Sequence, residues 1–244
     1  MNEVMTTWLL VAAIVFILEF SITAPYGKHA SDKKGCKLPA GIAWLLMEAL
    51  SPLIMAYQFY IGVNHNIVAW AFLIMWETHY IHRAFIYPLR LKLSKPVPVI
   101  IALSGASFNF VNAGLNGLQL FQWGPAYQES YLQTPKFIIG ALTMAISFIM
   151  NILSDSILIN LRKPGETGYK IPYGGLFKFV SCPNYFSEMM EWIGFAVATW
   201  TLSGLTFALW TVANLFPRAI ANHKWYKQKF ENYPNRKALI PFVL

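Results

Sequence analysis

The sequence predicts an all-α integral membrane protein with seven transmembrane helices, its N-terminus outside and its C-terminus in the cytoplasm. Of its 244 residues, 56% are hydrophobic, 16% are aromatic and only 12% are charged, a balance far from that of soluble domains. The mean hydropathy is +0.44. The apolar residues gather into long runs, and the basic residues gather between those runs. These three observations together indicate the fold class.

The apolar runs have the length that a helix needs to cross a bilayer, about 17–25 residues. In chain order they cover residues 6–24, 40–62, 67–89, 97–120, 136–160, 183–201 and 204–222. The first run lacks the cleavage pattern of a signal peptide, so we expect it to be retained as a span. No connection is long enough for a soluble domain, and residues 1–244 are therefore predicted to form a single membrane domain.

The basic residues predict the orientation, because Lys and Arg concentrate in short cytoplasmic loops. Of the 19 Lys and Arg residues, all except Arg83 and Lys136 lie in the loops 25–39, 90–96 and 161–182 or after residue 217. The alternate loops contain none. Topology and anionic lipid therefore account for the net charge of +8, without a nucleic-acid partner.

Two polar stripes flank the basic loop around residues 161–182. Asn151 and Asp155 are four residues apart on one predicted helix, and Asn184, Glu188 and Glu191 recur at offsets of four and seven on the next. Residues at these spacings share a helix face. Polar side chains at membrane depth are costly and usually face a cavity. We therefore expect a functional site here.

A second polar region is predicted in the first half of the chain. Glu48 and Tyr80 would lie at similar depths, about 12 and 14 Å from the cytoplasmic edge at 1.5 Å per residue, so they could meet. Asn109, Asn112 and Asn116 form a further stripe. For Asn109 and Asn112 a structural role is equally compatible with the pattern, because Asn also joins transmembrane helices. Glu77 is expected to pair with Arg83 or a histidine.

Several functional classes are excluded or left without support. There is neither a G-x-G-x-x-G sequence after a strand nor a Walker sequence, so a Rossmann domain is excluded. Cys36 and Cys182 have no spacing typical of a metal site, and no metal is expected. The basic loop could bind phosphate through Arg162, Lys163 and Lys170, with glycines at 165, 168, 174 and 175. Without further information a simple positive-inside loop is the preferred interpretation.

Longer motifs supply that information. The segments NLRKPGETGYKIPYGGLF (160–177), NYFSEMMEWIGFA (184–196) and RAIANHKWYKQKFENYPNRKALIPF (218–242) resemble the steroid 5α-reductase family. YGKHA at 26–30, Glu48 before Ser51 and Pro52, HYIHR at 79–83, IYP at 86–88 and the pair Asn116–Gly117 extend the resemblance through nearly the whole chain.

The resemblance implies a seven-helix membrane oxidoreductase that uses NADPH to reduce the C4–C5 double bond of 3-oxo-Δ4-steroids. Its cofactor part would lie mainly in residues 136–244 and its substrate part mainly in residues 1–120. Glu48 and Tyr80 match the pair that holds the C3 carbonyl of the substrate. The resemblance also implies that Trp44, Asn116 and Trp192 bind substrate. The implied cofactor residues are Lys28, Lys95, Asn151, Asp155, Arg162, Tyr169, Asn184, Glu188, Arg218, Asn222, His223 and Tyr226.

The implied chemistry suits these residue types. Hydride delivered to the β-carbon of an enone moves negative charge onto the carbonyl oxygen, where Tyr80 would act as donor. Glu48, in an apolar span, could remain protonated and donate to the same oxygen or orient Tyr80. The α-carbon then takes a proton from water or a nearby acid. The steroid would enter from lipid, and no protein partner is inferred, so a monomer would suffice.

The chain departs from the family pattern at three positions: Asn222 replaces a cofactor-binding His, Ser187 replaces a Gly, and Glu77 replaces an apolar residue. Two alternatives stay open. One is a related membrane reductase that acts on enoyl thioesters or another sterol double bond, and the other is a seven-helix receptor or transporter without enzymatic activity. The host membrane would be the bacterial inner membrane or the endoplasmic reticulum.

Overall fold

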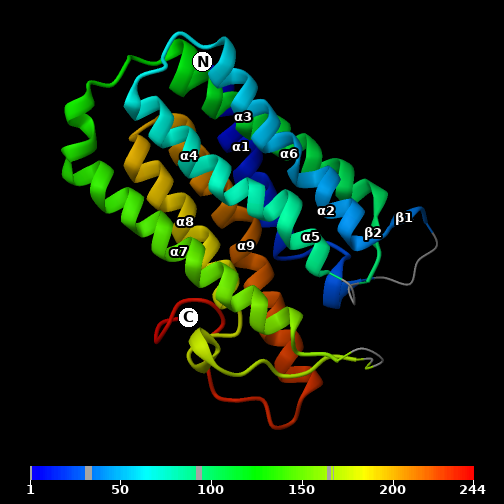
Figure 1. Ribbon diagram of the computed structural model, residues 1–244. Coiled ribbons are helices and arrows are strands. Elements are labelled where there is room, and N and C mark those ends of the chain that lie inside the picture. Colours follow the sequence, from blue (N-terminus) through cyan, green and yellow to red (C-terminus); the bar gives the residue numbers. More distant parts are fainter. Residues whose placement is uncertain (1, 31–34, 92–94, 164–165, 167) are drawn as a thin grey trace. The chain divides into compact units, whose positions relative to one another are not determined.

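A computed structural model describes residues 2–30, 35–91, 95–163, 166 and 168–244 (Figure 1). The described chain divides into two compact units. Unit 1 comprises Met1–Thr23, Leu142–Gly194 and Ala208–Leu244, and unit 2 comprises Ala24–Ala141 and Phe195–Phe207.

Each of the seven predicted runs is largely helical. The helices are α1 (Asn2–Glu19), α2 (Ala40–Glu48), α3 (Leu50–Ile61), α4 (Ile67–Ile81), α5 (Tyr87–Arg90), α6 (Val99–Gly117), α7 (Pro135–Ile159), α8 (Pro183–Thr199) and α9 (Leu202–Lys229). Helix α1 ends five residues earlier than the run 6–24 predicts, and α9 continues seven residues beyond residue 222. The apolar runs therefore predict where helices occur better than where they end.

Shorter elements connect these helices. They are the π-helical turns η2 (His82–Ile86) and η3 (Leu118–Trp123), the 3-10 turns η1 (Gly27–His29), η4 (Glu129–Gln133) and η5 (Gly175–Lys178), and the strands β1 (Lys37–Leu38) and β2 (Val97–Pro98). The two strands pair antiparallel, with Leu38 opposite Val97.

Three helical stretches of the described chain are long and apolar enough to cross a membrane. They are Ala40–Ile61, Val99–Trp123 and Pro135–Ile159. The membrane class is thereby supported, while seven spans and the orientation of the two termini stay predictions.

The second predicted run is one helix interrupted at Glu48. Proline lacks a backbone N–H, and its ring collides with the carbonyl four residues earlier in a regular helix. Pro52 stands four residues after Glu48, and α2 ends at Glu48 while α3 begins at Leu50. The Glu-x-x-x-Pro spacing thus places Glu48 at a helix break inside an apolar run.

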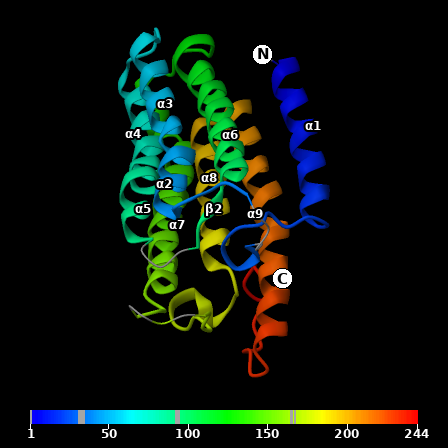
Figure 2. The same ribbon diagram turned by 90° about the vertical axis from the view of Figure 1, so that its right-hand side faces the viewer.

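Unit 2 is built around α6, which packs against α2 and α3, while α3 also packs against α4 (Figures 1 and 2). Two glycines on α6 permit the close approach. A Cβ atom at Gly105 would lie 2.8 Å from the Met47 sulfur, and one at Gly117 would lie 2.6 Å from Gln58 Cβ. Small residues let helix backbones approach in membrane proteins, where packing drives association.

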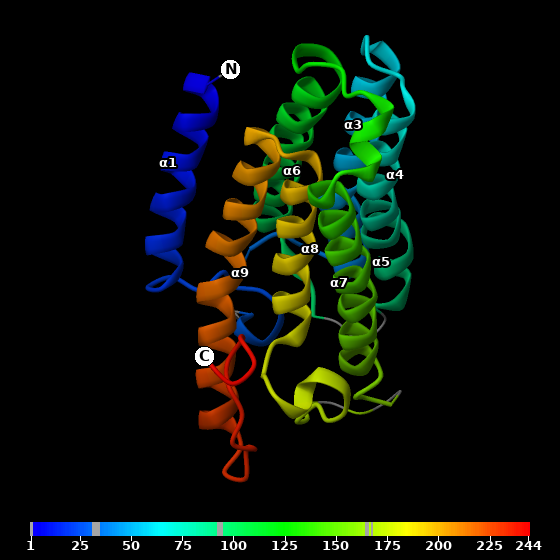
Figure 3. The ribbon, with the colours of Figure 1, turned by 90° about the vertical axis from the view of Figure 1, so that its left-hand side faces the viewer.

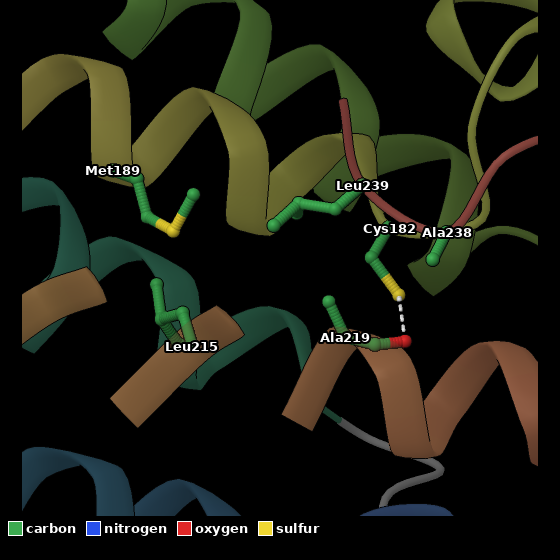
Figure 4. Close-up of a cluster of buried hydrophobic side chains, with 6 residues drawn as sticks. All are labelled: Cys182, Met189, Leu215, Ala219, Ala238 and Leu239. Atoms are coloured by element: carbon green, nitrogen blue, oxygen red, sulfur yellow. Dashed lines mark hydrogen bonds between the residues drawn. The ribbon is translucent and has the colours of Figure 1, made fainter. Parts of the chain in front are cut away.

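Unit 1 contains two side-by-side helix pairs. Helix α1 lies beside the unit 1 part of α9 (Figure 2). The Trp8 ring lies against the Trp210 ring with a tilt of 36° and centroids 4.6 Å apart, and the Trp210 indole N–H donates to the Trp8 carbonyl. The unit 1 parts of α8 and α9 also run side by side (Figure 3). Between them lies a core of Cys182, Met189, Leu215, Ala219, Ala238 and Leu239, in which the Cys182 thiol points to the Ala219 carbonyl (Figure 4).

The C-terminal segment is tied into unit 1 by backbone hydrogen bonds around an isolated parallel bridge between Val180 and Lys237. Ser181 N–H donates to the Lys237 carbonyl at 2.8 Å, Lys237 N–H donates to the Phe179 carbonyl at 3.0 Å, and Cys182 N–H donates to the Ala238 carbonyl at 3.1 Å. Because α8 begins at Pro183, this pairing holds the first turn of α8 in place.

Candidate functional site

In unit 2, one asparagine joins the two residues predicted to hold a substrate carbonyl. The Tyr80 hydroxyl donates to Asn109 Oδ1 at 3.0 Å, and Asn109 Nδ2 donates to Glu48 Oε2 at 3.0 Å and to the Met47 carbonyl at 2.8 Å. Tyr80 and Asn109 are 3% and 4% exposed, and Glu48 is half-buried. The structure therefore brings Glu48 and Tyr80 to one amide, as their predicted depths suggested.

Aromatic residues surround this group. Trp76 lies against Tyr80 with ring centroids 5.1 Å apart, and its indole N–H donates to Ser51 Oγ at 3.1 Å. The buried Arg83 guanidinium lies 4.5 Å from the centre of the half-buried Trp44 ring. A cation on an aromatic face is favourable where water is excluded. Trp44 is thus held against a positive charge.

Glu77 does not behave as the sequence suggested. It makes neither a hydrogen bond nor an ion pair with Arg83 or a histidine within the part of the chain that the structure describes, and its Oε1 is buried without a partner. The expected pairing is therefore wrong. Glu77 lies on the margin of the buried face of α4, between buried Trp76 and exposed Thr78, which leaves the acid half-buried.

In unit 1, the two predicted polar stripes meet. Asn151 Nδ2 of α7 donates to the Asn184 carbonyl at 2.9 Å, and Asn184 Nδ2 of α8 donates to Asp155 Oδ1 at 3.0 Å. Asn151 and Asp155 are 4% and 3% exposed. Glu188, one turn after Asn184, is half-buried. The arrangement is a chain of hydrogen bonds between two amides and a carboxylate that joins α7 to α8.

A second group lies along α9. Arg218 is buried and donates through Nε to the Tyr185 hydroxyl at 3.2 Å. Asn222 and Tyr226 follow at one-turn intervals and are also buried. The Tyr226 ring stacks on Tyr233 with centroids 5.2 Å apart and planes 9° apart. One face of α9 thus carries three of the predicted cofactor residues.

Further residues support this face of α9 that were not predicted from the sequence. Ser181 accepts a hydrogen bond from the Tyr233 hydroxyl at 2.7 Å, and the Arg236 Nε donates to the same hydroxyl at 2.9 Å. Arg236 Nη1 also donates to the Pro172 and Phe177 carbonyls. Both Tyr233 and Arg236 lie in the terminal motif 218–242, so the motif was the available signal. Their contacts with Ser181, Pro172 and Phe177, however, cross more than 50 residues of chain.

His223 is already engaged, since a ring nitrogen lies 2.7 Å from Ser181 Oγ. It lies just beyond the predicted span 204–222. Burial, with the positive charges of Lys227 and Arg236, lowers the pKa of this imidazole below its usual 6.5. The folded protein therefore binds fewer protons here than the unfolded chain.

We expect a pH dependence of stability from this histidine. The contribution of neutral His223 is fully present above pH 6.5 and is lost as the pH falls toward the lowered folded-state pKa. Thermal midpoints in detergent between pH 8 and pH 5 should decline for the wild type and decline less for His223→Asn. Equal slopes for the two proteins would contradict this assignment.

Within the basic loop, one acidic residue binds two lysine residues. Glu166 accepts hydrogen bonds from Lys170 Nζ at 2.6 Å and from the Lys163 N–H at 2.8 Å, and these two contacts lower the pKa of its carboxyl. The Arg162 guanidinium lies 5.8 Å from the centre of the Tyr169 ring, and Tyr169 packs edge-on against Trp225. Gly168, Gly174 and Gly175 have positive φ angles. Gly165 lies outside the described residues.

The remaining predicted residues are divided between the units. Trp192 is 2% exposed in unit 1. In unit 2, Lys28 lies in η1 and is half-buried, Lys95 is exposed just before β2, and Asn116 is buried in α6.

Comparisons with known proteins decide the family. The profile of the family described as 3-oxo-5-alpha-steroid 4-dehydrogenase matches residues 95–244. The chain belongs to this family. It is 40% identical to 3-oxo-5-alpha-steroid 4-dehydrogenase 1 of Rattus norvegicus over 231 residues, which are 92% of this chain and 88% of the relative. It is 41% identical to steroid 5-alpha-reductase DET2 of Solanum lycopersicum over 242 residues, 96% of this chain and 93% of the relative.

Membership has two consequences. The chain is an oxidoreductase of the 3-oxo-5α-steroid 4-dehydrogenase type, so the receptor or transporter alternative is set aside. Animal and plant relatives that align with most of the chain confirm the family resemblance that the motifs indicated.

Proposed function

We propose that the protein uses NADPH to reduce the C4–C5 double bond of 3-oxo-Δ4-steroids to 5α-dihydrosteroids. The observation that carries this proposal is the near full-length relation to steroid 5α-reductases. The residues joined by Asn109 supply a chemical reason, because they can act on a ketone oxygen in a buried setting.

Glu48 and Tyr80 polarise the C3 carbonyl in this proposal. Bound NADPH supplies the hydride that ends on C5, and the electron pair of the C4–C5 bond shifts toward the C3 oxygen. A phenol already aimed at an amide oxygen can turn its hydrogen to a better acceptor, such as an oxygen that gains negative charge. The enolic carbon C4 then takes a proton from water or an acid, which restores the ketone.

Asn109 positions both groups. Because Glu48 Oε2 accepts the Asn109 amide hydrogen, a proton on this carboxyl group resides on Oε1, from which it can be donated to the C3 oxygen. The same amide accepts the Tyr80 hydroxyl, so the two donors are oriented by one side chain. We assign Asn109 as a positioning residue.

The residues of unit 1 fit a nicotinamide cofactor. Amide and carboxylate side chains such as Asn151, Asp155 and Asn184 suit a carboxamide and ribose hydroxyls, and all three are already organised by hydrogen bonds. Arg236 Nη2 is buried without an acceptor among the described residues, so unit 1 holds a cationic donor suited to an anionic group. The other residues proposed to hold NADPH are Lys28, Lys95, Arg162, Tyr169, Glu188, Arg218, Asn222, His223 and Tyr226.

The substrate and the membrane complete the proposal. Trp44, Asn116 and Trp192 would contact the steroid, which enters from lipid. Seven spans would place the C-terminus in the cytoplasm, where NADPH is available. The host membrane is that of the endoplasmic reticulum or the bacterial inner membrane, and the enzyme needs no protein partner.

The direct test is NADPH oxidation by the detergent-solubilised protein with testosterone. The product should gain two hydrogens by mass spectrometry and co-migrate with the 5α epimer in chromatography. If the protein binds NADPH but does not reduce the steroid, the proposed substrate is wrong. If the protein does not bind NADPH, the proposed cofactor is wrong.

Replacing Arg162 by alanine should weaken NADPH binding. A hydrogen bond from a charged donor contributes about 1.5–3 kcal/mol, so the dissociation constant should rise about 10- to 100-fold while turnover at saturating NADPH changes little. Fluorescence titration of NADPH would measure it. Lys178→Ala removes the same charge from η5 in the same loop and should bind NADPH normally. Equal effects of both substitutions would mean that only the net charge of the loop matters.

A further inference from the structure

Two buried asparagines share one face of α6. Asn109 and Asn116 are seven residues apart in a continuous α-helix, which is about two turns and about 10.5 Å at 1.5 Å per residue. Their side chains are 4% and 1% exposed. Along the axis of α6, Asn109 lies at the same height as Glu48 and Tyr80, with which it forms hydrogen bonds. Asn116 lies about two turns further along the same face.

The two amides differ in how their hydrogen bonds are used. Asn109 donates twice and accepts once. Asn116 Nδ2 donates to the Asn112 carbonyl at 2.9 Å, whereas its Oδ1 is buried and has no partner among the described residues. If the Asn116 amide were flipped, its Oδ1 would face the Asn112 carbonyl oxygen, and two acceptors would repel each other. The amide orientation is therefore fixed, and Oδ1 is the atom without a partner among the described residues.

Neighbouring amides beyond Asn116 are paired. The side chains of Gln58 and Gln122 hydrogen-bond to each other, and Gln119 Oε1 accepts the Ser203 N–H at 2.8 Å. A buried acceptor without a donor is destabilising and is uncommon in native proteins. A donor from outside the chain would satisfy this oxygen.

The spacing indicates where that donor lies on a steroid. The tetracyclic nucleus is rigid, and its C3 oxygen and its C17 substituent stand at opposite ends, separated by a length close to the two helical turns between Asn109 and Asn116. A ligand whose C3 oxygen lies at Glu48 and Tyr80, and whose long axis runs along α6 toward Gly117, brings its C17 substituent to the level of Asn116.

We propose that Asn116 Oδ1 accepts a hydrogen bond from a C17 hydroxyl group, so that the enzyme prefers 17-hydroxy over 17-oxo substrates. This inference rests on the proposed steroid reduction. A hydroxyl supplies the missing donor, whereas a ketone sets its own lone pairs against Oδ1. Buried polar groups that lose their partner discriminate strongly between ligands.

Testosterone and androstenedione form the matched pair for the test, because they share the 3-oxo-Δ4 ring and differ only in the hydroxyl or ketone at C17. The wild type should show a kcat/KM for testosterone at least about tenfold above that for androstenedione, since one neutral hydrogen bond is lost and one buried acceptor is left unpaired. Asn116→Leu should lower the ratio of the two kcat/KM values, testosterone over androstenedione, about tenfold.

Two further variants make the result specific. Asn116→Asp retains an acceptor and should retain the preference. Asn112→Leu removes a buried amide one turn away on the same helix and should leave the ratio of the two substrates unchanged. Continued turnover of androstenedione by Asn116→Leu shows that this variant is folded.

The outcomes separate this inference from the proposed function. Reduction of both steroids with the same ratio in wild type and Asn116→Leu would overturn the role of Asn116 and leave the reductase intact. A wild type that reduces neither steroid would overturn the proposed function, and the role of Asn116 with it.

Discussion

Glu48→Gln and Tyr80→Phe should each lower turnover by about 10²–10³, the usual effect of removing one donor to a developing oxyanion. Both residues are held by Asn109, and neither lies among the residues proposed to bind NADPH. NADPH affinity should therefore be unchanged while kcat falls. Steady-state kinetics with testosterone, combined with NADPH titration, would measure both quantities.

Matched substitutions elsewhere in unit 2 provide the control. Glu129→Gln in η4 and Tyr60→Phe in α3 remove the same atoms from exposed side chains and should leave turnover at the wild-type value. Wild-type rates for both Glu48→Gln and Tyr80→Phe would refute the assignment of this pair. A loss of NADPH binding in either variant would indicate a structural role.

Arg236→Met should destabilise unit 1 by about 3 kcal/mol, because it deletes hydrogen bonds from a charged donor and leaves buried acceptors unpaired. Arg236 is 7% exposed and donates to the Tyr233 hydroxyl and to the carbonyls of Pro172 and Phe177. For a chain of this size, such a change lowers the thermal midpoint by about 6–12 °C. A thermal melt in detergent would detect it.

The adjacent residue offers the control for that measurement. The Lys237 side chain is exposed, although its backbone belongs to the same strand pairing, so Lys237→Met should keep the wild-type midpoint. If Arg236→Met and Lys237→Met melt together, the buried guanidinium contributes nothing to the stability of the C-terminal segment.

The stability of the C-terminal segment bears on the cofactor residues. Arg236 and Tyr233 support Ser181, which lies two residues before α8 and within hydrogen-bond distance of His223. Asn184 is in the first turn of α8. A change at Tyr233 can therefore alter NADPH affinity through the position of α8 alone, without contact with the cofactor.

The sequence by itself determined the helical class, the approximate location of every long helix and the family. Long apolar runs must satisfy their backbone groups as helices in lipid, so composition and length are sufficient for this conclusion. Short-range periodicity was equally reliable, because Asn109, Asn112 and Asn116 share a buried face. All of these features depend on residues close together in the chain.

Only the tertiary structure decided which polar groups are paired. Asn109 joins Glu48 and Tyr80 across 61 and 29 residues of chain, and Arg236 contacts Pro172 across 64 residues. Within the described part of the chain, Glu77 does not make the pairing that its sequence neighbours suggested. Such pairings depend on helix packing and on side-chain rotamers, which the spacing of residues along a helix does not specify. The unpaired oxygen of Asn116 belongs to the same class, since a missing partner is visible only when every neighbour has been placed.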